Sequence, residues 1–448
     1  LVGSEICIRD SPSPPPLPRP FGQARRQSCE LFAPAICRAS LAAGMGYPAP
    51  MTTRAGSMFA LVGVVLIGMT GFGVFLPIFP FLALDVGASP TATTIAMGAY
   101  SFGQLIASPF WGRLSDRVGR KPILIAGLVG GVVSYLWLAR AASVEELGAA
   151  RLFGGLMAGN VGAAFAAAAD LANDKTRARN MGFLGAAVGL GFIAGPALGA
   201  LLIGDEESRE SFAFACHVSA ALAGLAALVA LVLFRESFPS EARRRPGEAR
   251  VSRFALLGSR PALARFIAVM FLMIAAQALM ETVFGLWAHA QLQWGAREVG
   301  WSLAGLGFGA VLLQGGGAGA ASRALGERMT LLVGLVLFAA GFGGMAAARE
   351  AAALIAALTA LVVGIGLATP ALNALIAEQA GESERGAVMG LSQSASALGR
   401  VAGPLASGPL FDAFSPGAPF LAATLLTLAA LFVALGEPMR EKAPGQSL

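Results

Sequence analysis

Apolar residues occur along the chain in runs of about twenty, the length a helix needs to cross roughly 30 Å of hydrocarbon. Short polar segments separate these runs. Six runs lie near 58–80, 92–111, 121–140, 147–169, 181–203 and 212–234, and six more lie near 263–288, 299–320, 330–348, 351–376, 387–411 and 418–435. The pattern predicts an all-α membrane protein with twelve transmembrane helices in two pseudo-symmetric six-helix bundles.

The polar segments set the expected domains. We expect an N-terminal bundle at 55–234, a cytoplasmic linker loop at 235–262, a C-terminal bundle at 263–435 and a cytoplasmic tail at 436–448. Residues 1–54 are different, because Pro and scattered Arg give no helical or strand period and too little apolar surface to fold. We expect this extension to be disordered or artefactual, with a natural start at Met51.

The composition fits a membrane protein, since 56% of the 448 residues are hydrophobic and 13% are charged. The net charge of +6 would also suit nucleic acid, but the basic residues gather in the loops after even-numbered helices. The opposite loops hold only Arg140, Arg209, Arg297 and Arg349. By the positive-inside rule, both termini and the linker loop are cytoplasmic. We therefore expect a multi-pass protein of the inner (plasma) membrane that contacts the lipid bilayer and no nucleic acid.

Cysteine and histidine positions give no sign of a metal site or an enzyme. Three of the four cysteines, Cys7, Cys29 and Cys37, lie in the N-terminal extension, and Cys216 is alone in a predicted helix. The two histidines lack the spacing of metal ligands. No cluster of catalytic acids or bases is visible, so we expect no catalytic residue, no metal and no cofactor.

A Gly-Pro element occurs twice, in the runs predicted as the fifth and eleventh helices. GLGFIAGPALGA carries Gly191, Gly195, Pro196 and Gly199, and ALGRVAGPLASG repeats the spacing with Gly399, Gly403, Pro404 and Gly408. Glycines four residues apart share a helix face that another backbone can approach, and proline bends a helix. Ordinary close packing explains one such element. The duplication favours matched bends in a gate between two halves that rock against each other.

The segment GRLSDRVGRK, residues 112–121, joins the second and third predicted helices and matches GAASRALGER, residues 319–328, in the second half. Gly112 and Gly119 permit a tight turn. Asp116, Arg117 and Arg120 place opposite charges at helix ends, where they can pair with neighbours. The alternative is a solvated basic turn that only sets the topology.

Glu281 is the carboxylate found well inside a predicted span, which makes it a functional candidate. Gln277 lies one turn away on the same face with Phe284 nearby, so this helix would present an acid, an amide and a ring to a cavity. Desolvation favours the protonated form of such an acid, and a nearby cation favours its charged form. Proton release can therefore be tied to substrate binding. The alternative is a glutamate at the outer mouth that reaches water.

Further polar residues lie in the predicted spans. Arg151, near the start of the fourth, can snorkel to the outer surface. Arg400 is near the middle of the eleventh and needs a partner, such as Glu281, or an anionic ligand. Other polar candidates either line a cavity or hydrogen-bond a neighbouring helix: Tyr100, Gln104, Asn160 and Asn373.

These motifs resemble those of the major facilitator superfamily. GRLSDRVGRK is similar to the loop signature between its second and third helices, and RLFGG, residues 151–155, is similar to the Arg-x-x-x-Gly signature of its fourth. MGFLGAAVGLGFIAGPALGA resembles the fifth-helix signature of its exporting antiporters, and LATPALNALIAEQ adds a tenth-helix match to the twelve-helix drug:proton antiporter branch, which includes the tetracycline efflux proteins. The resemblance implies that Asp116 latches the outward-facing state against the eleventh helix, and that Arg151 takes part in proton transfer.

The first helix departs from this branch. LIGMTGFGVFLPIFPF resembles the tetracycline exporters around Pro77, but Gly68 stands where they carry an acid, which leaves Glu281 as the candidate coupling acid. We expect a monomeric secondary transporter that exports small amphipathic, drug-like molecules by proton-coupled alternating access. The alternatives are an importer or facilitator of a small metabolite such as a sugar, and a transport-inactive membrane sensor or scaffold.

Overall fold

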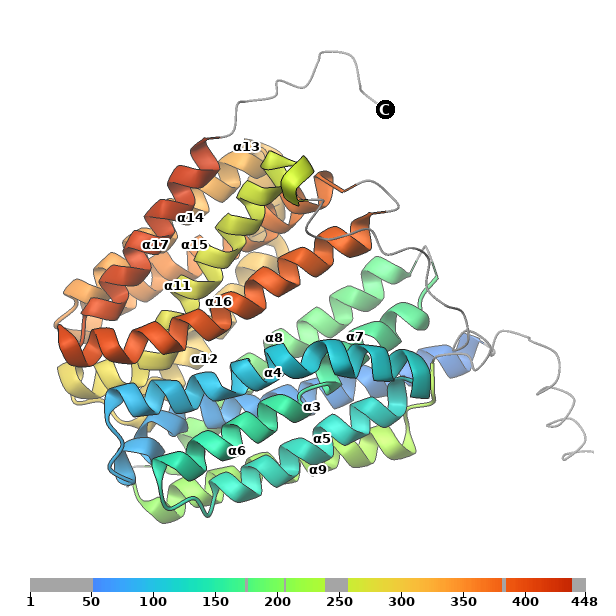
Figure 1. Cartoon of the computed structure of the whole chain (residues 1–448), viewed down its shortest axis with the longest axis horizontal. Coiled ribbons are helices and arrows are strands. Elements are labelled where there is room, and N and C mark those ends of the chain that lie inside the picture. Colours follow the sequence, from blue (N-terminus) through green and yellow to red (C-terminus); the bar gives the residue numbers. More distant parts are fainter. Residues whose placement is uncertain (1–50, 174–175, 205–206, 238–256, 381–383, 437–448) are drawn as a thin grey trace, which may run out of the picture. The chain divides into compact units, whose positions relative to one another are not determined.

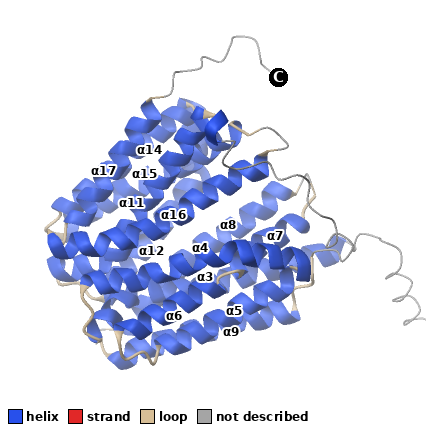
Figure 2. Ribbon diagram, viewed as in Figure 1, coloured by secondary structure: helices blue, strands red, loops and turns tan. Residues whose placement is uncertain are grey.

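The structure is a computed structural model, and it describes residues 51–173, 176–204, 207–237, 257–380 and 384–436. The chain divides into a first unit, Leu1–Arg54, and a second unit, Ala55–Leu448. Nearly all described residues belong to the second unit, where they form helices joined by short loops and contain no strand (Figure 2). The expectations for the N-terminal extension, most of the linker loop and the tail concern residues outside the described ranges.

The first six predicted spans are all present as helices (Figure 1). They are α3 (Met51–Asp85), α4 (Pro90–Val118), α5 (Arg120–Leu138), α6 (Val144–Met157) with α7 (Asn160–Asp170), α8 (Arg177–Ile203) and α9 (Arg209–Val232). The fourth span is divided into α6 and α7 because the backbone leaves the helix at residues 158–159.

The second six spans follow in the same order. They are α11 (Pro261–Leu292), α12 (Ala296–Leu312) with the π-helix η2 (Leu313–Gly317) and α13 (Ala318–Leu325), α14 (Glu327–Ala347), α15 (Ala351–Glu378), α16 (Arg385–Ala413) and α17 (Ala418–Leu435). The twelve-span, all-α architecture expected from the sequence is confirmed for the described residues.

Side-chain contacts show that successive loops lie at opposite ends of the helices. Arg209, at the start of α9, pairs with Asp85 at the end of α3 at 3.0 Å. Glu236, which follows α9, accepts a hydrogen bond from the Arg120 backbone at the start of α5 at 2.9 Å. We call the end with the loops 86–89, 204–208, 293–295 and 414–417 the outer end, following the topology that the charges predict. The opposite end is the inner end.

Serine side chains fix where three helices begin at the outer end. Ser89, Ser143 and Ser208 precede α4, α6 and α9, and each accepts a hydrogen bond from a backbone N–H in the first turn of its helix. Such caps satisfy N–H groups that have no partner inside the helix. These three helices therefore begin where the chain enters the apolar region again after an outer loop.

Nine helices of the described part are long and apolar enough to cross a membrane. Three of the predicted spans fall outside this group: α4 and α16 are more polar, and α12 has only 17 residues before it continues as a π-helix. All three contact the opposite half, since α4 packs on α16 and α12 packs on α8. A helix covered by protein on one side needs less apolar surface than one surrounded by lipid.

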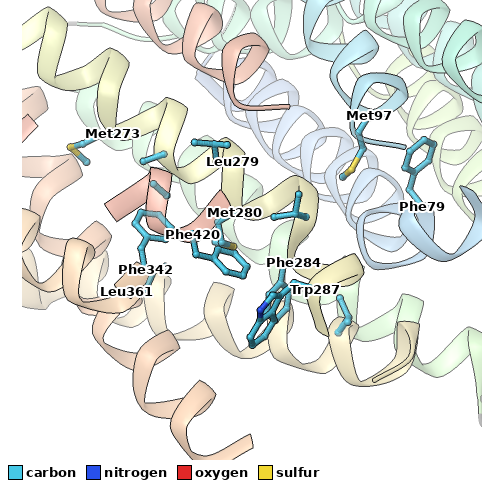
Figure 3. Packing of buried hydrophobic residues seen from close by; sticks show 14 of the residues in the cluster. Phe79, Met97, Met273, Leu279, Met280, Phe284, Trp287, Phe342, Leu361 and Phe420 are labelled. Carbon is cyan, nitrogen blue, oxygen red and sulfur yellow. The ribbon is translucent and has the colours of Figure 1, made fainter. Parts of the chain in front are cut away.

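The second half has an aromatic core. Trp287 stacks with Phe284 at a centroid distance of 6.4 Å and meets Phe420 of α17 edge-on at 5.3 Å (Figure 3). All three rings are 1% exposed or less. This packing corrects one expectation, because Phe284 lies in the core of its own half and does not face a cavity beside Glu281.

Candidate functional site

Glu281 and Gln277 form a polar pair in the middle of α11. The Gln277 amide donates a hydrogen bond to the Glu281 carboxylate at 2.7 Å. The Glu281 side chain is exposed, yet protein surrounds it at longer range, which is the situation of a group that lines an internal cavity. The acid and the amide expected from the sequence therefore lie on one face of α11, and their place in a substrate cavity stays a prediction.

Arg400 on α16 lies near this pair without bonding to it. Its charge is attracted to Glu281, but the two side chains form no direct ion pair in the described structure. Tyr100 on α4, in the opposite half, also lies within electrostatic range of Arg400. Glu281, Arg400 and Tyr100 therefore share one region between the two halves, and a ligand or a proton there would change the attraction between the two charges.

Arg151 occupies an aromatic cage on the other side of Tyr100. Its guanidinium carbon lies 4.6 Å from the centroid of the Tyr100 ring and 5.1 Å from that of Phe75. The rings of Phe72 and Phe79, also on α3, lie at 5.9 and 5.7 Å. The side chain does not snorkel to the surface, since the residue is only 4% exposed. A cation is attracted to ring faces at these distances.

A cavity of about 50 Å³ adjoins Arg151. Gly68 of α3, Tyr100 of α4, Tyr135 of α5 and Asn160 of α7 contribute to its lining together with Arg151. The break between α6 and α7 places the start of α7 at this cavity. Tyr100 and Asn160 thus line a cavity of the first half, and their contact with substrate stays a prediction.

All glycines of the repeated element except Gly408 pack their helix against the first helix of its own half. A methyl group at Gly195 of α8 would lie 2.5 Å from the Cα atom of Gly73 on α3. One at Gly403 of α16 would lie 2.6 Å from the Cβ atom of Ala278 on α11. Neither position has room for a side chain. The sequence repeat is therefore a repeat of packing, with Gly191 and Gly199 against α3 and Gly399 against α11.

At both prolines the helix meets the opposite half, through the ring of Pro404 and through the backbone carbonyl of Pro196, whose ring packs on α3 of its own half. A methyl group at Gly98 of α4 would lie 2.8 Å from the Cβ atom of Pro404, and one at Gly300 of α12 would lie 2.8 Å from the carbonyl oxygen of Pro196. The expectation that the whole element forms the contact between halves is therefore refined: all its glycines except Gly408 pack inside their own half, whereas Gly408 and the two proline positions meet the other half.

The loop 112–121 carries a charge network at the inner end. Arg120 pairs with Asp116 at 2.7 Å and with Asp170, at the end of α7, at 2.9 Å. Gly119 has a φ of 109°, and the matching Gly326 has a φ of 79°, so both copies use the conformation that glycine allows. Gly112 and Arg117 are exposed. In this conformation Asp116 is paired within its own half, and its contact with the eleventh helix stays a prediction.

Two carboxylates join the halves at the outer end. Asp412, near the end of α16, accepts hydrogen bonds from the backbone N–H of Thr91 at 3.0 Å and from its hydroxyl at 2.5 Å. Glu207 accepts one from the backbone N–H of Ala296. Thr91 and Ala296 lie in the first turns of α4 and α12, where a carboxylate is favoured by the helix dipole. Figure 1 shows α4 and α16 side by side at the end where α4 begins.

Several of these residues were not found from the sequence. Asp412 and Glu207 lie in short polar segments, and nothing local shows which helix of the other half they meet. The cage on α3 did leave a signal, since Phe72, Phe75 and Phe79 follow helical spacing. Gln104 is partly exposed on α4 and Asn373 is partly buried on α15. Neither side chain makes a contact that assigns it to the site.

Two six-helix halves that meet around a polar region are the architecture of transporters that work by alternating access. The family model of the Major Facilitator Superfamily matches residues 61–318 and 269–447, and the chain belongs to this superfamily. It is 32% identical over 363 residues to the class G tetracycline resistance protein of Vibrio anguillarum, covering 79% of this chain and 90% of that protein. It is 29% identical to multidrug resistance protein 1 of Bacillus subtilis (strain 168), covering 85% and 96%.

Solved structures agree on the fold. The human organic anion transporter MFSD10 matches with a TM-score of 0.64 at 24% identity, covering 87% of this chain and 100% of that one. The nucleoside transporter NupG matches with a TM-score of 0.67 at 12% identity, covering 84% and 97%. Such identities support the fold alone. The chain is thus a multi-pass membrane protein of a transporter superfamily.

Proposed function

We propose that this protein exports small amphipathic, drug-like molecules in exchange for protons. The observation that carries the proposal is Glu281, a carboxylate within a membrane-spanning helix that lines the region between the halves and lies near Arg400. The relatives named as tetracycline and multidrug resistance proteins support export of drug-like compounds. The carboxylate and the relatives support the same function, because a drug exporter driven by protons needs an acid for which substrate and proton compete.

Glu281 takes the place of the acid missing at Gly68. When deprotonated, it accepts the Gln277 hydrogen bond and attracts Arg400. Protonation removes this negative charge, so Arg400 and any bound cationic group lose their attraction to it. A proton that enters from the outer side would then release substrate outward and permit the return step.

The contacts between the halves support an inward-open conformation. The carboxylate contacts of Asp412 and Glu207 close the outer end, and the proline positions of α8 and α16 lie against the other half. Opening of the outer end requires these contacts to separate. In the proposed outward-facing state the inner ends approach, and Asp116 exchanges its contact with Arg120 for one with α16. The protein would work as a monomer in the plasma membrane, with both termini cytoplasmic.

Transport in proteoliposomes tests this proposal. Purified protein is reconstituted with an imposed pH gradient, and uptake or efflux of a compound panel that includes tetracycline is followed together with a pH-sensitive dye. The proposal expects at least one compound to move against its gradient while protons move the opposite way. Co-directional movement of compound and protons would instead show a symporter, and transport without proton movement would show a facilitator.

A further inference from the structure

We infer that Arg151 and the cavity beside it form a binding site for a small monovalent anionic group, such as the carboxylate of a transported compound. As a statement about substrate, the inference rests on the proposed function. As a statement about anion binding, it stands on the cavity alone. It adds a requirement to the proposed function, since an amphipathic substrate would then carry a negative group.

The first observation is a buried charge without a counter-charge. Arg151 is 4% exposed, and its Nε atom has no hydrogen-bond partner. It forms no ion pair with any described residue, and no carboxylate lines the adjoining cavity. A buried guanidinium needs hydrogen-bond acceptors or an opposite charge, which ring faces supply only in part. The cage therefore holds the cation but leaves its N–H groups without acceptors.

The second observation is the chemistry of the lining. Tyr100, Tyr135 and Asn160 line the cavity, and the side chain of none of them hydrogen-bonds another described residue. Each can donate a hydrogen bond through a hydroxyl or an amide. Together with the guanidinium they form a set of donors around one space, which suits a ligand that only accepts hydrogen bonds. A carboxylate or a halide is such a ligand.

The third observation is the helix break in the fourth span. Asn160 begins α7, no side chain caps this helix, and Ala158 and Val161 also line the cavity. The first N–H groups of a helix point out of its N-terminus and favour an anion. Discontinuous membrane helices of transporters place such ends at anionic groups of the substrate. The helix end and Arg151 thus act on the same space.

The fourth observation is Gly68, which lines the same cavity and leaves it unfilled. A Cβ atom at Gly68 would lie 3.4 Å from the Leu128 side chain, an ordinary contact, so a larger side chain is tolerated there. The cavity of about 50 Å³ holds a carboxylate or a halide in place of a few waters. An aspartate at this position would bring its own carboxylate to Arg151 and compete with an external anion.

The test measures anion binding to the purified full-length protein in detergent by isothermal titration calorimetry. Acetate is compared with its neutral counterpart acetamide in a chloride-free buffer, with chloride as a competitor in a second series. The variants are Arg151→Gln, Gly68→Asp and the matched neutral control Gly68→Asn. Size-exclusion chromatography and circular dichroism verify the fold of each variant. If Arg151→Gln does not fold, the Gly68 pair alone decides the result.

We expect acetate to bind the wild-type protein at least tenfold more tightly than acetamide. Binding should fall at least tenfold in Arg151→Gln and in Gly68→Asp relative to Gly68→Asn. Equal acetate binding in the two Gly68 variants, or no acetate and no chloride binding to the wild type, would overturn the inference. Binding of chloride without acetate would overturn the carboxylate assignment and identify a halide site. Because this experiment needs no proton movement, its failure is distinct from failure of proton-coupled export.

Discussion

Removal of the Asp412 carboxylate at the outer end should shift the protein towards its outward-open state. Asp412→Ala deletes both hydrogen bonds to Thr91, at 3.0 and 2.5 Å, and the favourable charge at the start of α4. These bonds cross from one half to the other, so they stabilise only a state in which the outer ends meet. The variant keeps the rest of the contact, including the close packing of Gly408 against α4.

The size of the shift follows from the bonds that are lost. Hydrogen bonds to a charged acceptor contribute about 1.5–3 kcal/mol each when they are protected. Asp412 is exposed, so solvent screening reduces the pair to about 1–2 kcal/mol. Since about 1.4 kcal/mol corresponds to a factor of ten, the ratio of inward-open to outward-open molecules should fall by about 5–30-fold. Asp412→Asn keeps one acceptor oxygen and should give a smaller fall.

Double electron–electron resonance measures this ratio. Spin labels at Glu210 and Phe414, exposed positions at the outer ends of opposite halves, report the distance between these ends. In a background without other reactive cysteines, Asp412→Ala should increase the population at the longer distance, and Asp412→Asn should give an intermediate value. An unchanged distance distribution in Asp412→Ala would refute the claim that this carboxylate holds the outer end closed.

Three further substitutions test the packing and the inner network. Gly195→Ala should destabilise the protein by about 1–3 kcal/mol through overpacking against α3, whereas Gly185→Ala, with open space around it, should not; thermal unfolding in detergent compares them. Phe284→Ala should cost about 3–5 kcal/mol in the same assay because it empties an aromatic core, and a loss below about 1 kcal/mol would contradict that placement. Arg120→Gln should expose α5 and α7 to faster proteolysis near Asp170, and unchanged cleavage would show that the pairs add nothing.

The helices and the repeat were predictable because both depend on local patterns. Runs of apolar residues set the spans, and matching glycine and proline spacing revealed that helices five and eleven are copies. The turn at Gly119 was predictable because glycine occurs at the matching position of the second half. That residue, Gly326, also adopts a positive φ. These features need no knowledge of which helices touch.

The partners of these residues were not predictable because they depend on the arrangement of helices in space. Only the structure shows that Gly195 and Gly403 pack inside their own halves, whereas Gly408 and Pro404 meet α4 of the other half. Phe284 and Gln277 are both within one turn or so of Glu281, yet Phe284 points into the core (Figure 3). The break before Asn160 was missed because Met157, Ala158 and Gly159 continue an apolar run without proline.

The most direct test of the account is proton movement in the Glu281→Gln variant. Proteoliposomes with a pH-sensitive dye inside receive a transported compound, and the proton flux is measured for wild type, Glu281→Gln and the control Glu210→Gln, whose carboxylate lies exposed at the outer end. Wild type and Glu210→Gln should couple compound and proton movement, whereas Glu281→Gln should lose the proton flux. Substrate-evoked proton flux that is undiminished in Glu281→Gln would contradict the claim that Glu281 is the coupling acid.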